Sequence, residues 1–327
     1  CAADVPDLVT GPSDIADLAR TSATDADLLE PVGRCGASRG WVRIDRRGLV
    51  RPTRVTEFLR SDHPAGWRRW VDFAGGAEVT AAVEALTAST SADPFASANG
   101  APFFEWMGAH PDRWATFDDA MAAGARVHGL GLAHVLDWST TTTVCDVGGG
   151  TGALLATLLD LEPHLHGTVF DLPAVVERAV DRPRLSVVGG DMFDTVPVGF
   201  DTYLLVAVAH DWGDDEVVDV LRRVREASHD ETRIVIVEHG RATVPQPDLA
   251  TSTDVLMAAL TGGGRERTID ELDELARRAG LRLERTHRLP SADVALVFRG
   301  GPVDGADRPA ARADRRQPGS DQAATSR

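Results

Sequence analysis

The sequence contains no lysine, and arginine supplies all 34 of its basic residues. Without lysine, the chain cannot use a Schiff-base lysine, a P-loop lysine or a kinase-type lysine. Mechanisms built on those groups are therefore excluded. An arginine-only, alanine-rich composition is typical of a high-GC bacterial source.

Cysteine and long apolar runs are also scarce. The three cysteines, Cys1, Cys35 and Cys145, show neither zinc-site nor disulfide spacing, so we expect free thiols. No apolar run approaches the roughly 20 residues that span a bilayer. The start, CAADVPDLV, lacks the charged and apolar regions of a signal peptide. We expect a cytoplasmic protein that does not enter the membrane.

Negative charge dominates the chain, whose formal net charge is −16 over 327 residues. Such a charge repels phosphate backbones, and no strong basic stripe offsets it, so we expect no nucleic-acid partner. The hydrophobic content of 43% is ample for one large α/β domain plus a smaller one. Small-molecule chemistry fits this balance best.

The N-terminal segment, residues 1–88, reads as short helices followed by a hairpin. In GPSDIADLAR, Ser13 is positioned to cap a helix, and WVRIDRRGLVRPT alternates around a turn. This order is a winged-helix pattern, although Pro31, Gly33 and Gly36 weaken the expected second helix. The segment either has no role beyond packing or binds DNA, and the negative net charge disfavours DNA binding.

Connecting helices are expected over residues 89–136, where aromatic and methionine side chains are dense. Two helices are predicted from Pro102 onward, and their stripes include Phe117 and Met121. Such stripes usually form core. Part of this one could instead line an apolar pocket for a flat substrate.

Residues 137–300 alternate apolar strands with helical segments, which predicts a doubly wound parallel α/β sheet. The tail, residues 301–327, has almost nothing to bury, so we expect it to be disordered. The strands expected in the sheet are TVCDV, GTVFDL, LSVVGGD, DTYLLVAVA, RIVIVEHG and DVALVFRG.

A glycine-rich turn, Gly148 to Gly152, follows the first of these strands and opens a helix. Glycines there let a ligand approach the backbone at the helix N-terminus. Gly148, Gly150 and Ala153 also satisfy the dinucleotide pattern, so an NAD-dependent oxidoreductase stays open. Asp146 favours a ligand with an ammonium or sulfonium group over a pyrophosphate. Asp171, ending the next strand, could accept hydrogen bonds from ribose hydroxyls in either case.

Further polar residues follow the third, fourth and fifth strands. Asp191, Met192 and Phe193 offer a carboxylate beside soft apolar groups that suit an adenine, although a cap or turn former is the alternative for Asp191. His210 ends the fourth strand, and either Glu238 or Glu266 could hold one imidazole nitrogen while the other faces a substrate. The acids and histidines show no compact metal-ligand spacing, so no metal is expected.

The ordered set DVGGGTG, FDLP, GDMF, HDW and GGGRERT resembles the winged-helix class of S-adenosylmethionine-dependent O-methyltransferases. That class includes plant caffeate-type, hydroxyindole and bacterial polyketide-tailoring enzymes. The resemblance, from about Gly11 to Gly300, implies a homodimer joined by the N-terminal domain and a Rossmann-like methyltransferase sheet with a reversed last hairpin. It also implies transfer of a methyl group to a hydroxyl, phenolic in type, of a small aromatic secondary metabolite, leaving S-adenosylhomocysteine.

The matching motifs imply roles for individual residues of this chain. The resemblance implies that His210 is the general base and that Glu238 and Glu266 orient it. Plant members have a lysine four residues before the histidine, where this chain has Val206. The residues implied to bind the cofactor are Asp146, Gly148, Gly150, Asp171, Leu172, Asp191, Met192 and Phe193, and those implied to shape the acceptor pocket are Phe117, Met121, Asp211, Trp212 and Met257.

Two other interpretations remain. Some bacterial relatives bind S-adenosylmethionine but act as hydroxylases or decarboxylases, and such members commonly lack the histidine of HDW. A non-catalytic winged-helix regulatory protein would need a basic DNA-binding face. Retention of His210 favours methyl transfer.

Overall fold

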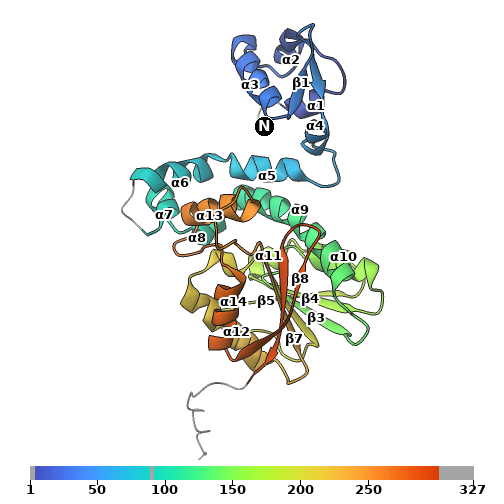
Figure 1. The fold of residues 1–327 in the computed structure, drawn as a ribbon, viewed down its shortest axis with the longest axis vertical. Helices are drawn as coiled ribbons and strands as arrows, with labels where there is room; N and C mark the ends of the chain where they lie inside the picture. The colour runs from blue at the N-terminus through green and yellow to red at the C-terminus, as the bar shows by residue number, and fades with distance from the viewer. Residues whose placement is uncertain (1–3, 89–91, 302–327) are drawn as a thin grey trace, which may run out of the picture.

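The computed structural model describes residues 4–88 and 92–301. Its elements form three parts along the long axis of the molecule: a small N-terminal unit, a helical layer, and a sheet with helices on both faces (Figure 1). The expected disorder of residues 302–327 and the thiol of Cys1 lie outside the described residues. Within the described part of the chain, no helix is both long and apolar enough to cross a membrane.

The N-terminal unit packs short helices against a two-stranded antiparallel hairpin. Its core is a cluster that includes Val9, Leu18, Leu29 and Val50. This matches the predicted helices-then-hairpin pattern. The elements are α1 (Val5–Leu8), α2 (Ile15–Thr21), α3 (Ala26–Ser38), β1 (Val42–Ile44), β2 (Val50–Pro52) and α4 (Arg54–Phe58).

Two details of this unit differ from the sequence analysis. The predicted Ser13 cap is wrong: Asp14 caps α2 by accepting from the Ala16 N–H at 2.8 Å, while Ser13 forms a bridge with Val50. The expected weakening of α3 is also wrong, because that helix runs through Pro31. Pro31 lies on the exposed side, where water can bond the carbonyl that loses its partner. Packing of α3 on α2 and β1 offsets the low helix propensity of its glycines.

A helical layer follows, and it lies between the N-terminal unit and the sheet (Figure 1). Helices α5 and α6, which the sequence analysis grouped with the N-terminal domain, pack against α9 and α13 respectively. An aromatic-rich cluster around Phe73, Phe95 and Phe103 fills this layer. Its helices are α5 (Trp67–Ala74), α6 (Ala77–Ala88), α7 (Pro94–Asn99), α8 (Phe103–Ala109), α9 (Pro111–Val135) and α13 (Leu249–Leu260).

The sheet has seven strands in the order β5-β4-β3-β6-β7-β9-β8, which confirms the doubly wound α/β prediction. Strands β5 to β7 are parallel, whereas β9 and β8 form an antiparallel end, the reversed hairpin that the resemblance implies. The strands are β3 (Thr143–Val147), β4 (His166–Asp171), β5 (Leu185–Gly189), β6 (Thr202–Val206), β7 (Arg233–Glu238), β8 (Leu281–Arg288) and β9 (Val294–Gly300).

Alternating side chains of the central strands enter two separate cores. Tyr203 and Leu205 pack on one face with α12 and α14, while Leu204 packs on the other with α9 and α10. Burial on both faces explains the continuous apolar runs of these strands. The remaining helices are α10 (Ala153–Leu161), α11 (Pro173–Val176), the 3-10 turn η1 (Ala209–Asp211), α12 (Asp214–Ala227) and α14 (Ile269–Arg278).

Candidate active site

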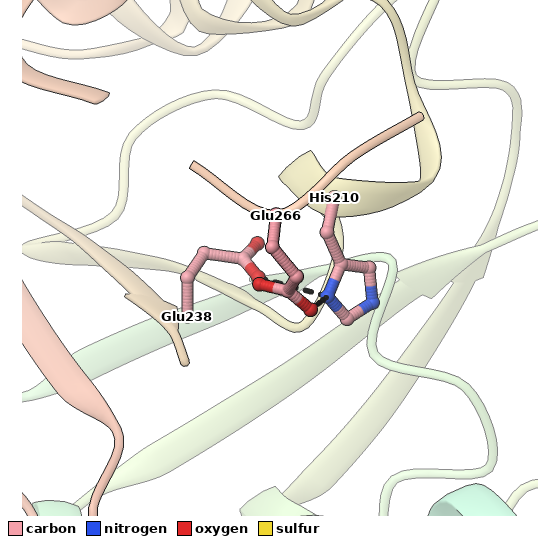
Figure 2. Close-up of side chains that lie close together, drawn as sticks. All are labelled: His210, Glu238 and Glu266. Atoms are coloured by element: carbon pink, nitrogen blue, oxygen red, sulfur yellow. Dashed lines mark ion pairs between the residues drawn. The ribbon is translucent and has the colours of Figure 1, made fainter. Parts of the chain in front are cut away.

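Three side chains from separate segments meet at the carboxyl edge of the sheet (Figure 2). His210 lies on η1 after β6, Glu238 ends β7, and Glu266 lies in the loop before α14. The Nδ1 atom of His210 is 3.1 Å from Glu238 Oε2 and 3.2 Å from Glu266 Oε1. Both carboxylates are buried, at 4% and 1% exposure. One imidazole nitrogen therefore faces two acids, and Nε2 is left on the other side of the ring.

The acids control the charge of His210. Burial lowers the pKa of His210, but the carboxylates of Glu238 and Asp211 outweigh it and hold this pKa well above its usual value. Burial raises the pKa of Glu238, yet His210 and the Ala209 N–H lower it overall, so Glu238 is ionised. Glu238 Oε1 accepts from the backbone N–H of Ala209 at 2.8 Å. The site is thus built to stabilise an imidazolium.

The backbone leading to His210 is strained. Ala207 has a φ of 54°, in the left-handed region that alanine rarely adopts, directly between β6 and η1. Its N–H donates to the carbonyl of Val237 at 2.9 Å, which ties this turn to β7. Strain of this kind persists where neighbouring contacts over-determine the backbone.

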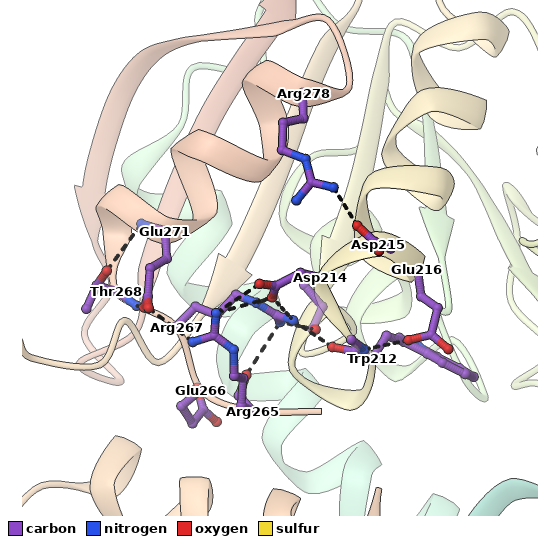
Figure 3. A network of polar contacts seen from close by, with 12 residues as sticks. Trp212, Asp214, Asp215, Glu216, Arg265, Glu266, Arg267, Thr268, Glu271 and Arg278 are labelled. Carbon is purple, nitrogen blue, oxygen red and sulfur yellow. Dashed lines mark hydrogen bonds and ion pairs between the residues drawn. The ribbon is translucent and has the colours of Figure 1, made fainter. Parts of the chain in front are cut away.

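Arg267 fixes the turn that carries His210 (Figure 3). Its buried guanidinium donates to the carbonyls of Ala209 at 2.6 Å and Trp212 at 2.7 Å, and it pairs with Asp214 at 2.8 Å. Gly264 lies so close to the same turn that a Cβ atom there would be 2.4 Å from the carbonyl oxygen of His210. The loop 262–268 therefore both supplies Glu266 and holds η1 in place.

This role of Arg267 did not follow from the sequence. Its only signal was its place in GGGRERT, since a buried arginine cannot be distinguished from a surface one by pattern.

The proposed cofactor residues lie along the ends of β3, β4 and β5. Asp171 accepts from the N–H groups of Gly150 at 2.8 Å and Leu172 at 2.7 Å, so it joins the glycine turn to β4. Gly148 and Gly150 both have positive φ, which glycine adopts without strain. Asp191 accepts from the Phe193 N–H at 2.8 Å, which is the turn-forming alternative.

Asp146 provides the electrostatic test of cofactor fit. It is 2% exposed, and burial together with the charge of Asp171 raises its pKa to about 8. A Cβ atom on Gly149 would be 2.9 Å from this carboxyl group, so the turn closes against it. A buried acid of this kind favours a cation beside it, which fits an ammonium or sulfonium ligand.

The predicted acceptor-pocket residues fall into two groups. Phe117, Met121 and Met257 belong to the apolar cluster of the helical layer, where Phe117 also contacts the rings of Phe73 and Phe103. Trp212 lies between Phe104, stacked at 5.5 Å, and Phe193, at 4.6 Å between ring centroids.

Asp211 lies beside His210, with its Oδ1 3.7 Å from His210 Nε2, and burial raises the pKa of Asp211 to about 6. Asp211 and Trp212 thus link His210 to Phe193 on one side and to Phe104 of the helical layer on the other.

Among the described residues, one group of three acidic or histidine side chains could hold a metal ion, and it is His210, Glu238 and Glu266. The ligand atoms lie within 4.8 Å of one another. An imidazole oriented by carboxylates through one nitrogen is equally the geometry of a general base.

The chain is similar to known proteins over most of its length. The model of an O-methyltransferase domain matches residues 77–282. O-methyltransferase SfmM3 of Streptomyces lavendulae is 34% identical over 87% of this chain and 89% of its own. The crystal structure of LaPhzM has a TM-score of 0.82 at 30% identity, with 91% of this chain and 92% of that one covered.

The chain belongs to the O-methyltransferase family. It is an S-adenosylmethionine-dependent O-methyltransferase, and the neocarzinostatin enzyme NcsB1, solved with S-adenosylmethionine and 2-hydroxy-5-methyl naphthoic acid, has the same fold with a TM-score of 0.75 at 31% identity over 91% of this chain and 93% of that one. One relative does different chemistry: aclacinomycin 10-hydroxylase RdmB of Streptomyces purpurascens is 33% identical over 90% of this chain and 82% of its own.

Proposed function

We propose that this enzyme methylates a hydroxyl group of a small aromatic secondary metabolite, with His210 as the general base. The observation that carries this proposal is the pair of buried carboxylates at 3.1 and 3.2 Å from His210 Nδ1. Their negative charge favours a proton on Nδ1, so Nε2 is the nitrogen that can accept a proton from substrate.

The proton transfer follows from charge. A phenol has a pKa near 10 and is mostly protonated at neutral pH, so its oxygen becomes a good nucleophile only as the proton leaves. In its neutral form, His210 accepts that proton at Nε2, and Glu238 and Glu266 stabilise the imidazolium that results. S-adenosylmethionine, when bound, supplies an electrophilic methyl group on a sulfonium centre and leaves as S-adenosylhomocysteine.

Binding of the cofactor is proposed along the edge formed by β3, β4 and β5. The buried acid Asp146 faces the cationic part of the cofactor, with Gly148 and Gly150 approaching its methionine portion. Asp171 and Leu172 hold the ribose, and Asp191 with Met192 and Phe193 flank the adenine. The bonds that Asp171 now makes to two backbone N–H groups pre-position its carboxylate at the turn.

The acceptor is proposed to lie between Trp212 and the helical layer. Relatives act on naphthoate and phenazine acceptors according to their names, which are flat aromatic molecules. Phe117, Met121 and Met257 supply apolar and polarisable surface of the kind such rings need. Asp211 and Trp212 shape the site beside the base.

We also propose a homodimer joined through the N-terminal unit. Large apolar side chains stand exposed there, with Leu28 at 66% and Val32 at 63% on one side of α3 and Trp41 at 54%. Exposed apolar groups gathered in this way mark interaction surfaces.

The function is tested by titrating the wild-type protein and His210→Ala with S-adenosylmethionine in a calorimeter, then assaying S-adenosylhomocysteine release with a panel of phenolic acceptors. Both proteins should bind cofactor, and only the wild type should turn over, with activity in His210→Ala reduced at least 100-fold. His166→Gln, an exposed histidine at the start of β4, is the control.

Two other outcomes would contradict parts of this proposal. Equal turnover by His210→Ala would remove His210 as the base. Cofactor binding without S-adenosylhomocysteine from any acceptor would favour the non-methylating chemistry that the hydroxylase relative represents.

A further inference from the structure

A second histidine lies behind the base. His239 follows Glu238 directly, and its ring centroid is 6.2 Å from that of His210. Its Nε2 atom is 4.0 Å from Glu266 Oε1, the same oxygen that faces His210 Nδ1. Glu266 therefore stands between two imidazoles.

His239 is held on its far side by Asp293, which precedes β9. The Nδ1 atom of His239 and Asp293 Oδ1 form a short contact. The other oxygen of Asp293 is 2.8 Å from Nε2 of His128 on α9. Asp293 is 4% exposed, so it is the buried member of this chain of contacts.

The far side of His239 opens onto a cavity of about 470 Å³, which Asp293, Arg241 and Thr268 also line. Protons can therefore exchange between His239 and solvent without passing through the proposed acceptor site. His210 is not among the residues that line this cavity.

Charged groups from several elements face the two rings. His210 faces Asp211 on η1, Glu238 on β7 and Glu266 on the loop before α14. His239 faces Glu266, Asp293 and His210. Two arginines pack alongside, with Arg241 donating to the carbonyl of Glu266 and pairing with Glu271, and Arg267 bonding Ala209 and Trp212.

The shared oxygen has no hydrogen bond in this arrangement, and neither has the second oxygen of Glu266. A buried carboxylate left in that state is costly unless cations face it. Burial lowers the pKa of His239, but its bond to Asp293 outweighs burial and raises this pKa above the ordinary value. The two histidines thus compete for one negative charge.

We propose that His239 is a positioning residue for methyl transfer: held by Asp293, it shares Glu266 with His210 and thereby sets the pH at which His210 becomes an unprotonated base. This inference rests on the proposed role of His210. Without the second cation, the acids around His210 would hold its proton to a higher pH.

The kinetic test uses His239→Gln, with His166→Gln as a matched control at an exposed site. Two charges about 6 Å apart at an effective dielectric constant of about 20 predict a shift of about one to two pH units. The acid limb of kcat/KM should move up by that amount, so activity at pH 7 falls about 10- to 100-fold and recovers at alkaline pH. KM for the acceptor should change little. A loss that is equal at every pH would overturn the proposal, since a purely structural defect gives that pattern.

The second test does not depend on catalysis. The imidazole resonances of His210 are followed by NMR against pH in the wild type, His239→Gln and Asp293→Asn. Coupling predicts a two-step titration of His210 in the wild type and a single, higher midpoint in His239→Gln, with a smaller shift in the same direction in Asp293→Asn because His239 then loses its charge. An identical His210 midpoint in all three proteins refutes the coupling. A shifted midpoint in a protein that methylates no acceptor would refute the proposed function and leave the coupling standing.

Discussion

At the scale of one residue, the burial of Asp146 makes the stability of the folded protein depend on pH. Its pKa is about 8 in the folded protein and near 3.8 in the unfolded chain. Between these pH values the folded state binds a proton that the unfolded state has released, so the folded state loses stability as pH rises from about 4 to 8. The same burial makes the ionised form receptive to a cation.

Replacing this acid separates the two effects. Asp146→Asn should raise the melting temperature at pH 8, by about 2–4 °C for each kcal/mol recovered, and change it little at pH 4. Wild-type affinity for S-adenosylmethionine should increase as pH rises toward 8, because the cation favours the ionised acid. The variant should bind more weakly and lose that dependence. Thermal scans measure the melting temperature and calorimetry measures the affinity, each at several pH values. If the variant binds weakly but keeps the wild-type pH dependence, a group other than Asp146 causes that dependence.

At the residue scale, motifs at strand ends predict which side chains gather at one edge of the sheet. His210, Glu238 and Glu266 come from three distant segments, yet each follows a strand or a glycine-rich turn at the same edge, and the structure brings them together. His239 and Asp293 escaped notice because nothing in a local pattern reports a contact across 54 residues.

At the scale of elements, the loop 262–268 acts as a brace for η1. Gly264→Ala would push a methyl group against the carbonyl of His210 and the backbone of Asp211, at 2.4 and 2.6 Å. Because both neighbours are backbone, the turn that carries His210 must shift. We expect kcat to fall by 10-fold or more, since small misplacements of a catalytic group are costly.

The matched control is Gly124→Ala within α9, where an added Cβ meets nothing within 4 Å. Alanine is favoured over glycine in a helix by up to about 1 kcal/mol, so this variant should keep full activity and gain stability. Steady-state kinetics and melting curves compare the two. Full activity in Gly264→Ala would show that the brace does not position the base.

Sequence patterns predict the buried strands of the sheet but miss one of its edge strands. The buried parallel strands were found because burial on both faces makes them apolar throughout. Strand β8 was absent from the apolar runs because it lies at the sheet edge, where residues such as Arg282, Glu284 and Arg285 are exposed. Only the resemblance to a known family implied that last hairpin.

For the whole molecule, apolar attraction and charge repulsion have opposite effects on the proposed dimer. The N-terminal unit lies at one end of the long axis, away from the sheet (Figure 1). It carries exposed apolar groups on α3, while each chain has a formal charge of −16. Apolar contact favours association of two copies, whereas their like charges repel over about 10 Å at 0.1 M salt. A dimer joined there should therefore tighten as ionic strength rises.

Light scattering after size exclusion should give twice the chain mass of 34.9 kDa at 0.5 M salt, with dissociation promoted by dilution at low salt. Leu28→Asp combined with Val32→Asp places two charges on the exposed side of α3 and should yield a monomer. The control is Val198→Asp, a valine with 76% exposure in the segment between β5 and β6. If the α3 variant remains a dimer while the control behaves as wild type, the contact lies elsewhere. If the variant is a folded monomer that still binds S-adenosylmethionine, the cofactor site is complete within one chain, because every group proposed to hold the cofactor comes from the sheet domain.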